Sequence, residues 1–128
     1  MASSSVTALS AALGAPPAQL LARENALVWK ALVVPAFQGA RVLGLVQGSD
    51  KAPEEEIEAP DPNVFGKTIK IENPDYANWI SRDQLVLRYI LNVVSPDILS
   101  HVIGLDTSAK VWTALETLTT FQSRSRTQ

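Results

Sequence analysis

The sequence predicts an all-α fold, a small bundle of about four to five helices with one long acidic loop. Two segments open with strong helix-start signals, because Asn73 and Ser95 are each followed by a proline and an aspartate. Apolar residues recur at helical spacing after both signals. With 128 residues, 46% of them apolar and 19% charged, the chain suits one soluble folded domain.

The individual elements follow from caps, prolines and glycines. A first helix is expected to begin at Asn25, and Pro35 should end or kink it. The apolar run over 40–48 suits a short helix or a strand, and its periodicity does not decide between them. Residues 73–94 predict the central helix, and residues 95–104 predict a short helix that stops at a glycine. Asp106 or Thr107 can cap the last helix, and no sheet of any size is expected.

Composition divides the chain into three parts. Residues 1–24 are rich in alanine and serine and predict a mobile arm. Residues 25–122 predict a helical domain. Residues 123–128 predict either a basic tail or the cut end of a helix. Inside the domain, residues 49–72 contain several prolines, and six of the 13 acidic residues lie between residues 50 and 62, so this stretch predicts an exposed acidic loop. The stretch TIKI within this loop is compatible with an isolated extended piece.

The residue inventory argues against catalysis. There is no cysteine, and the single histidine, His101, has no second histidine with which to bind a metal. No nucleophile motif, phosphate-binding loop or calcium loop is present. We therefore expect no enzyme, no cofactor, no metal site and no small-molecule substrate.

Hydropathy predicts neither a membrane span nor a secretory signal. No apolar run approaches the roughly 18 residues that a span requires, and no basic residue precedes Arg23 at the amino terminus. We expect a protein of the cytoplasm or the nucleus.

The candidate interaction residues are large apolar side chains on the predicted helices. They suit a shared core or, alternatively, a groove that binds a partner peptide. These residues are Trp29, Trp79, Leu87, Trp112 and Leu115.

Two further features are polar. Asp83 lies on the apolar face of the central helix, where it is either an edge carboxylate near Arg82 or Arg88 or a buried acid that bonds an indole or a helix end. Arg124 and Arg126 could contact RNA, but the net charge of −2 argues against a dedicated nucleic-acid module. Any such contact is expected to be weak.

The order of several motifs resembles the Gag region of plant copia-type long-terminal-repeat retrotransposons. In the segment from Tyr76 onward the resemblance rests on Trp79, Asp83, Ser95-Pro96, Gly104, Thr107, Ala109, Val111-Trp112, Leu115 and Ser123 to Arg126. Upstream it rests on Asn25, Trp29, Lys30, Pro35 and Gly39. Ala26 stands where the family often has an aromatic residue, which would leave the first helix less tightly docked.

The resemblance implies an all-helical capsid-like domain that self-associates around RNA. The family's downstream zinc knuckle and polyprotein enzymes have no counterpart here, so we expect the amino-terminal lobe of a capsid protein. The alternative is a host-retained Gag-like adaptor that binds a partner protein through an apolar helix groove. A third, weaker alternative is a small RNA-binding protein that uses the Ser-Arg tail. The partner is accordingly a second copy or a host protein.

Overall fold

The computed structural model describes residues 2–119 and contains both helices and a small sheet. Its elements, in chain order, are α1 (Ala2–Leu13), the 3-10 turn η1 (Arg23–Asn25), α2 (Ala26–Gly39), α3 (Leu43–Gln47), β1 (Glu56–Pro60), β2 (Thr68–Glu72), α4 (Pro74–Asn92), α5 (Pro96–Val102) and α6 (Ser108–Thr119). Strands β1 and β2 form a two-stranded antiparallel sheet. The all-α prediction is therefore wrong, and the fold mixes α and β structure.

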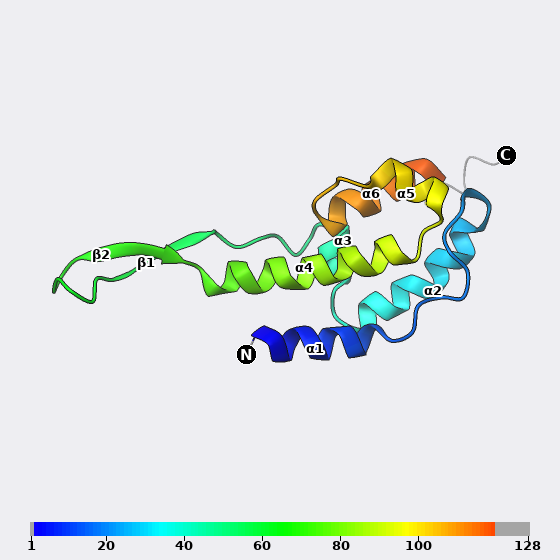
Figure 1. Cartoon of the computed structure of the whole chain (residues 1–128). Coiled ribbons are helices and arrows are strands. Elements are labelled where there is room, and N and C mark those ends of the chain that lie inside the picture. Colours follow the sequence, from blue (N-terminus) through cyan, green and yellow to red (C-terminus); the bar gives the residue numbers. More distant parts are fainter. Residues whose placement is uncertain (1, 120–128) are drawn as a thin grey trace.

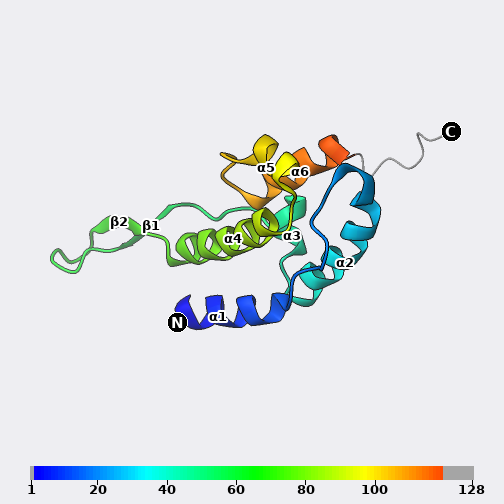
Figure 2. The same ribbon diagram turned by 45° about the vertical axis from the view of Figure 1, so that its right-hand side comes forward.

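The long helix α4 runs through the middle of the helical body (Figure 1). Helix α1 packs on one side of it and α6 on another, and α3 and α5 pack against α6. Helix α2 lies at the end of the body remote from the hairpin, which extends outward beyond the start of α4 in both views (Figures 1 and 2). The body and the hairpin thus occupy opposite ends of an elongated molecule.

The predicted start signals of two helices are confirmed. Asn73 caps α4 by accepting the N–H of Asp75 at 3.0 Å, with Pro74 at the first helical position. Ser95 caps α5 in the same way, because its Oγ accepts the N–H of Ile98 at 3.4 Å. The apolar run over 40–48 contains the helix α3, which ends at Gly48 in the left-handed conformation.

Helix α2 differs from its prediction in two respects. It continues through Pro35 to Gly39, so the proline neither ends the helix nor marks its boundary. Asn25 precedes the helix, but its side chain accepts the N–H of Ala22 and donates to the Leu20 carbonyl instead of capping α2. These two bonds fix the conformation of residues 20–25, which lead into α2.

Residues 2–13 form a packed helix, whereas the sequence predicted a mobile arm over residues 1–24. Leu9 and Leu13 of α1 are buried in the core that α2 and α4 share. Farther along, Leu21 is buried and bonds through its backbone to Val93 and Ser95. Burial of these leucines offsets the entropy lost when this segment, rich in alanine and serine, becomes ordered.

The acidic loop predicted over 49–72 contains the hairpin. Ile57 pairs with Ile71 and Ala59 with Ile69, an alternation with the period of two that a strand requires. Pro60 ends β1, where the lack of an N–H is tolerated. Residues 49–55 do run as an irregular segment before β1.

The core is built around an aromatic cluster. The rings of Trp29 and Trp112 lie 6.0 Å apart, and Phe37 contacts both Trp112 and Tyr89 with centroid distances of 5.8 and 5.7 Å. The indole N–H of Trp29 donates to the Val93 carbonyl at 2.9 Å. The cluster therefore ties α2 to α4 and α6 with packing and one buried hydrogen bond.

Candidate interaction surfaces

Most of the predicted interaction residues lie in the core. Trp29, Leu87, Trp112 and Leu115 are buried, and they come from three helices, α2, α4 and α6. Trp79 is only partly buried, and its indole N–H donates to the Asp50 carbonyl at 3.0 Å. The tryptophans consequently hold the body together, and one of them also fastens the segment that leads into the hairpin.

The acid on the apolar face of α4 is buried and bonds a helix start. Asp83 is 1% exposed and accepts the hydroxyl of Ser108 at 2.5 Å and its backbone N–H at 3.3 and 3.4 Å. Ser108 is the first residue of α6. Of the two readings open from the sequence, the structure has the buried acid at a helix end, and this carboxylate connects two helices.

The remaining predicted polar residues do not gather at one place. His101 is exposed near the end of α5, and Arg124 and Arg126 lie outside the described residues. Within residues 2–119, no three histidine, aspartate or glutamate side chains come together in a group that could hold a metal ion. No helix in this part of the chain combines the length and apolar character needed to cross a bilayer.

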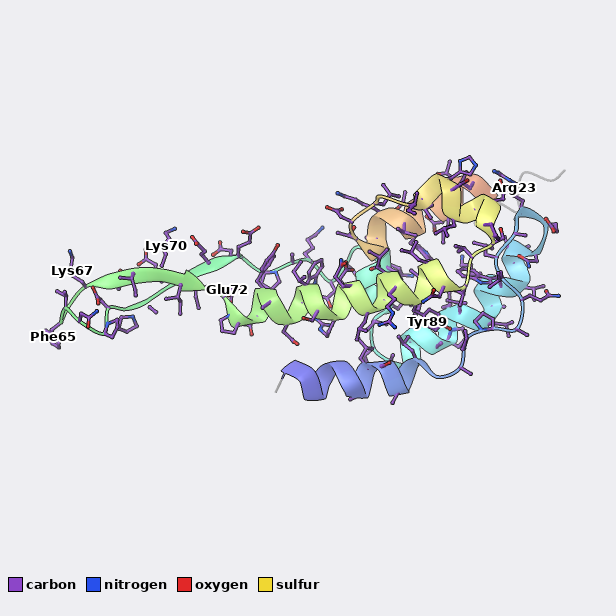
Figure 3. All side chains as sticks on the ribbon, in the orientation of Figure 1. Arg23, Phe65, Lys67, Lys70, Glu72 and Tyr89 are labelled. Atoms are coloured by element: carbon purple, nitrogen blue, oxygen red, sulfur yellow. The ribbon has the colours of Figure 1, made fainter. Side chains whose placement is uncertain are left out.

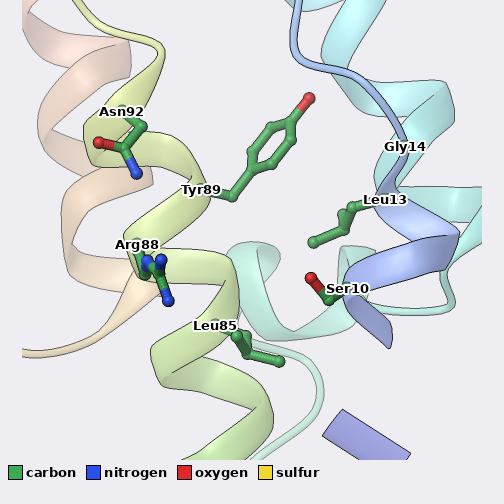
Figure 4. Close-up of a pocket in the computed structure, with 7 residues that line it drawn as sticks. All are labelled: Ser10, Leu13, Gly14, Leu85, Arg88, Tyr89 and Asn92. Atoms are coloured by element: carbon green, nitrogen blue, oxygen red, sulfur yellow. The ribbon is translucent and has the colours of Figure 1, made fainter. Parts of the chain in front are cut away.

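A pocket of about 200 Å³ opens between α1 and α4 (Figure 4). Leu85, Arg88, Tyr89 and Asn92 of α4 face Ser10 and Leu13 of α1 across it (Figure 4). Burial raises the pKa of the Tyr89 phenol. The pocket is smaller than the roughly 300–1,000 Å³ usual for sites that enclose a small molecule, so its geometry favours contact with single side chains over a substrate.

The most unusual surface is the outer face of α2, which we call the α2 stripe. Leu27, Val28 and Leu32 are 50%, 62% and 57% exposed. Ala31 and Pro35 are exposed between them on the same side of the helix, opposite the buried Trp29 and Val33 side. A helix that is apolar all round normally has both faces covered.

The hairpin carries a second exposed apolar surface. Its isoleucines Ile57, Ile69 and Ile71 are 37%, 39% and 38% exposed. Phe65 is fully exposed at the far end of the hairpin, as Figure 3 shows. The sequence contained both signals, the apolar outer face of α2 and the alternating isoleucines, but neither was recognised as a surface.

Comparison with known proteins gives two partial similarities. Over 96 residues, 74% of the chain, the sequence is 29% identical to the retrovirus-related Pol polyprotein from transposon RE2 of Arabidopsis thaliana. Over the same length it is 28% identical to the corresponding polyprotein from transposon RE1 of that plant. The matched segment is 6% of the length of each polyprotein.

No protein-family model matches the chain, and no solved structure is significantly similar to it. The two similarities support a retrotransposon origin and a plant source for the sequence. The polyproteins are much longer than this chain, so their activities do not transfer to it directly.

Proposed function

We propose that this chain is a Gag-derived, capsid-like lobe, a structural and non-catalytic protein that self-associates. The similarity to retrotransposon polyproteins supports an origin in a retrotransposon. The order of motifs that resembles Gag supports this part of the polyprotein rather than its enzymes. The single observation that carries the proposal is the α2 stripe.

The α2 stripe is suited to a protein partner by its chemistry. All five of its residues are uncharged and apolar: Leu27, Val28, Ala31, Leu32 and Pro35. Burying such side chains yields about 25 cal/mol for each Å² of apolar surface removed from water, and contiguous exposed apolar patches commonly mark association sites. A second copy of the chain offers the same stripe and needs no other component.

The adaptor alternative has less support. A peptide groove at the tryptophans would need accessible indole faces, yet Trp29 and Trp112 pack against each other and against Phe37. A weak RNA contact by Arg124 and Arg126 remains a separate proposal about residues outside 2–119.

The proposal is tested by the mass of the chain in solution. Light scattering after size exclusion, over a concentration series, should give a mass that rises above that of one chain. Leu32→Glu should lower the mass at every concentration, because it puts a charge in the middle of the stripe without touching the core. Circular dichroism should show that this variant still folds.

A matched control is available in Ile103→Glu. Ile103 is 68% exposed and lies outside the α2 stripe, between α5 and α6. The Ile103→Glu variant should associate as strongly as the wild-type chain. A wild-type chain that stays monomeric at every concentration would refute self-association.

A further inference from the structure

The hairpin lacks the neighbours that normally stabilise a small sheet. A lone two-stranded hairpin is marginal in water, and three or more strands or a covering helix are usually needed. Here β1 and β2 project beyond the helical body (Figures 1 and 2). The hairpin is anchored at its base, where the N–H of Asn73 donates to the Glu55 carbonyl at 2.8 Å.

The two faces of the hairpin differ completely in chemistry. Directly opposed pairs on one face are Ile57 with Ile71 and Ala59 with Ile69. The other face has Glu56 opposite Glu72 and Glu58 opposite Lys70. Side chains alternate between the two faces along a strand. A strand that joins this sheet with its apolar residues beside the isoleucines therefore enlarges both the apolar face and the charged face.

The two edges of the hairpin are not equivalent. The bonds from Asn73 to Glu55 and from Asp61 to Lys67 fix the odd-numbered residues as the hydrogen-bonded pairs. The backbone N–H groups of the even-numbered residues therefore point away from the partner strand. On β1 this outer edge is interrupted by Pro60, which has no N–H, whereas on β2 the N–H groups of Thr68, Lys70 and Glu72 form an uninterrupted row.

The charges on β2 are complementary to a second copy of β2. Glu72 faces Glu56 directly, a like-charge pair that disfavours the isolated hairpin. Lys70 lies two residues away on the same strand and therefore on the same face. An antiparallel copy can place its Lys70 opposite Glu72, and twofold symmetry then repeats the pair. In the same register Ile71 faces its own counterpart on the symmetry axis.

We propose that two copies of the chain join along the outer edges of β2 and form a four-stranded antiparallel sheet, with Lys70 of each copy opposite Glu72 of the other. This inference rests on the proposed self-association and names one of its contacts. The overlap runs from Ile69 to Asn73, because Pro74 begins α4 and has no N–H to donate. A register with Lys70 opposite Lys70 overlaps more of β2 but opposes like charges.

The first test exchanges the two charges. Lys70→Glu places glutamates opposite each other in a pair of identical copies, and Glu72→Lys places lysines opposite each other. Each variant alone should dimerise about tenfold or more weakly than the wild-type chain, while an equimolar mixture of the two should recover dimers because every pair is again complementary. Effects inside one hairpin cannot produce such recovery on mixing. Failure of the mixture to recover would refute the charge pairing.

The second test uses the absence of cysteine from the chain. In the proposed register Ile71 and its counterpart form a non-hydrogen-bonded pair with Cα atoms about 4.5 Å apart, within the range that a disulfide spans. Ile71→Cys should therefore give a disulfide-linked dimer on mild oxidation. Ile57→Cys, on the same face but on β1, is the matched control and should link far more slowly.

The outcomes separate this contact from self-association in general. Equal linking at both positions would indicate stacking of apolar faces and would overturn edge pairing. No linking at Ile71 in a wild-type chain that does associate would overturn this inference alone and leave the proposed function standing. Capture of an extended peptide by monomeric chains, in place of a second copy, would also overturn it. A chain that never associates would refute both proposals.

Discussion

Asp83 of α4 holds the start of α6 through Ser108, whose hydroxyl and backbone N–H both donate to the buried carboxylate. The hydroxyl bond is 2.5 Å long. A carboxylate at a helix amino terminus is also stabilised by the helix dipole. One acid on an otherwise apolar face thereby fixes the position of the last described helix against the central one.

Replacing Asp83 by alanine should destabilise the fold more than replacing it by asparagine. Asp83→Ala leaves two buried donors of Ser108 unpaired and should lower the free energy of unfolding by about 2–4 kcal/mol. Asp83→Asn keeps an acceptor oxygen and should cost about half as much. Chemical denaturation followed by circular dichroism measures both.

The control for this prediction is an exposed acid. Asp97 contacts Arg23 at 3.4 Å with most of its side chain in water, so Asp97→Ala should change stability by less than about 1 kcal/mol. If Asp83→Ala behaved like Asp97→Ala, the link between α4 and α6 would not contribute to stability.

The sequence predicted those parts of the fold whose signals are local. The caps Asn73 and Ser95, each followed by a proline, determine where α4 and α5 begin without any distant partner. The partner of Asp83, in contrast, lies 25 residues away along the chain. Its identity depends on how α6 packs on α4, which no local pattern contains.

The hairpin and α1 were mispredicted for different physical reasons. In the hairpin, the alternation of Ile57 with Ala59 and of Ile69 with Ile71 was masked by neighbouring acids and prolines that disfavour strands in general. In α1, an alanine-rich composition hid two leucines, Leu9 and Leu13, whose burial depends on a surface that α2 and α4 create together. The α2 stripe was not predicted as a surface, because apolar periodicity does not reveal which face of a helix is covered.

Two glycines in helices should respond oppositely to alanine. A Cβ at Gly39, the last residue of α2, would meet no atom within 4 Å, so Gly39→Ala should stabilise the fold by about 0.5–1 kcal/mol. A Cβ at Gly44 of α3 would lie 3.1 Å from the Asp50 Cβ and 3.2 Å from the Ser49 Oγ. Gly44→Ala should therefore destabilise the fold by about 1–2 kcal/mol.

The sign at Gly44 depends on how firmly Asp50 is held. Its N–H donates to the Gly44 carbonyl, its carbonyl accepts the Trp79 indole, and its carboxylate contacts Arg82 at 3.5 Å. These contacts prevent the turn from moving away. Thermal unfolding of the two variants side by side measures the difference, and a Gly44→Ala melting temperature at or above that of Gly39→Ala would contradict it.

Tyr89 should titrate above its ordinary range. Burial beside Phe37 raises the pKa of its phenol, since the charged tyrosinate is poorly solvated there. The folded-state pKa lies above the unfolded value of about 10, so this contribution to stability is complete below pH 10 and is lost as the pH rises through the folded pKa. Tyr76→Phe leaves Tyr89 as the single tyrosine, and its ultraviolet absorbance reports the titration. The midpoint should fall in concentrated urea, and equal midpoints in both states would contradict the prediction.

Asn73 joins the hairpin to the central helix, and its two functions can be separated. Its Oδ1 caps α4, and its Nδ2 donates to the Glu54 carbonyl at 2.8 Å. Asn73→Asp keeps the capping oxygen but loses the donor, so global stability should change little while trypsin cleavage after Lys67 and Lys70 becomes faster. Asn73→Ala should lose both and cost about 1–2 kcal/mol.

Ser95→Ala serves as the control because it removes the cap of α5 and has no bond to the hairpin. It should lower stability by about 1 kcal/mol with little effect on cleavage at Lys67 and Lys70 beyond that lower stability. Cleavage sites and rates are measured by mass spectrometry under native conditions. If Asn73→Asp were cleaved no faster than the wild-type chain, the bond to Glu54 would not restrain the hairpin, and its orientation would depend on the backbone bond between Asn73 and Glu55 alone.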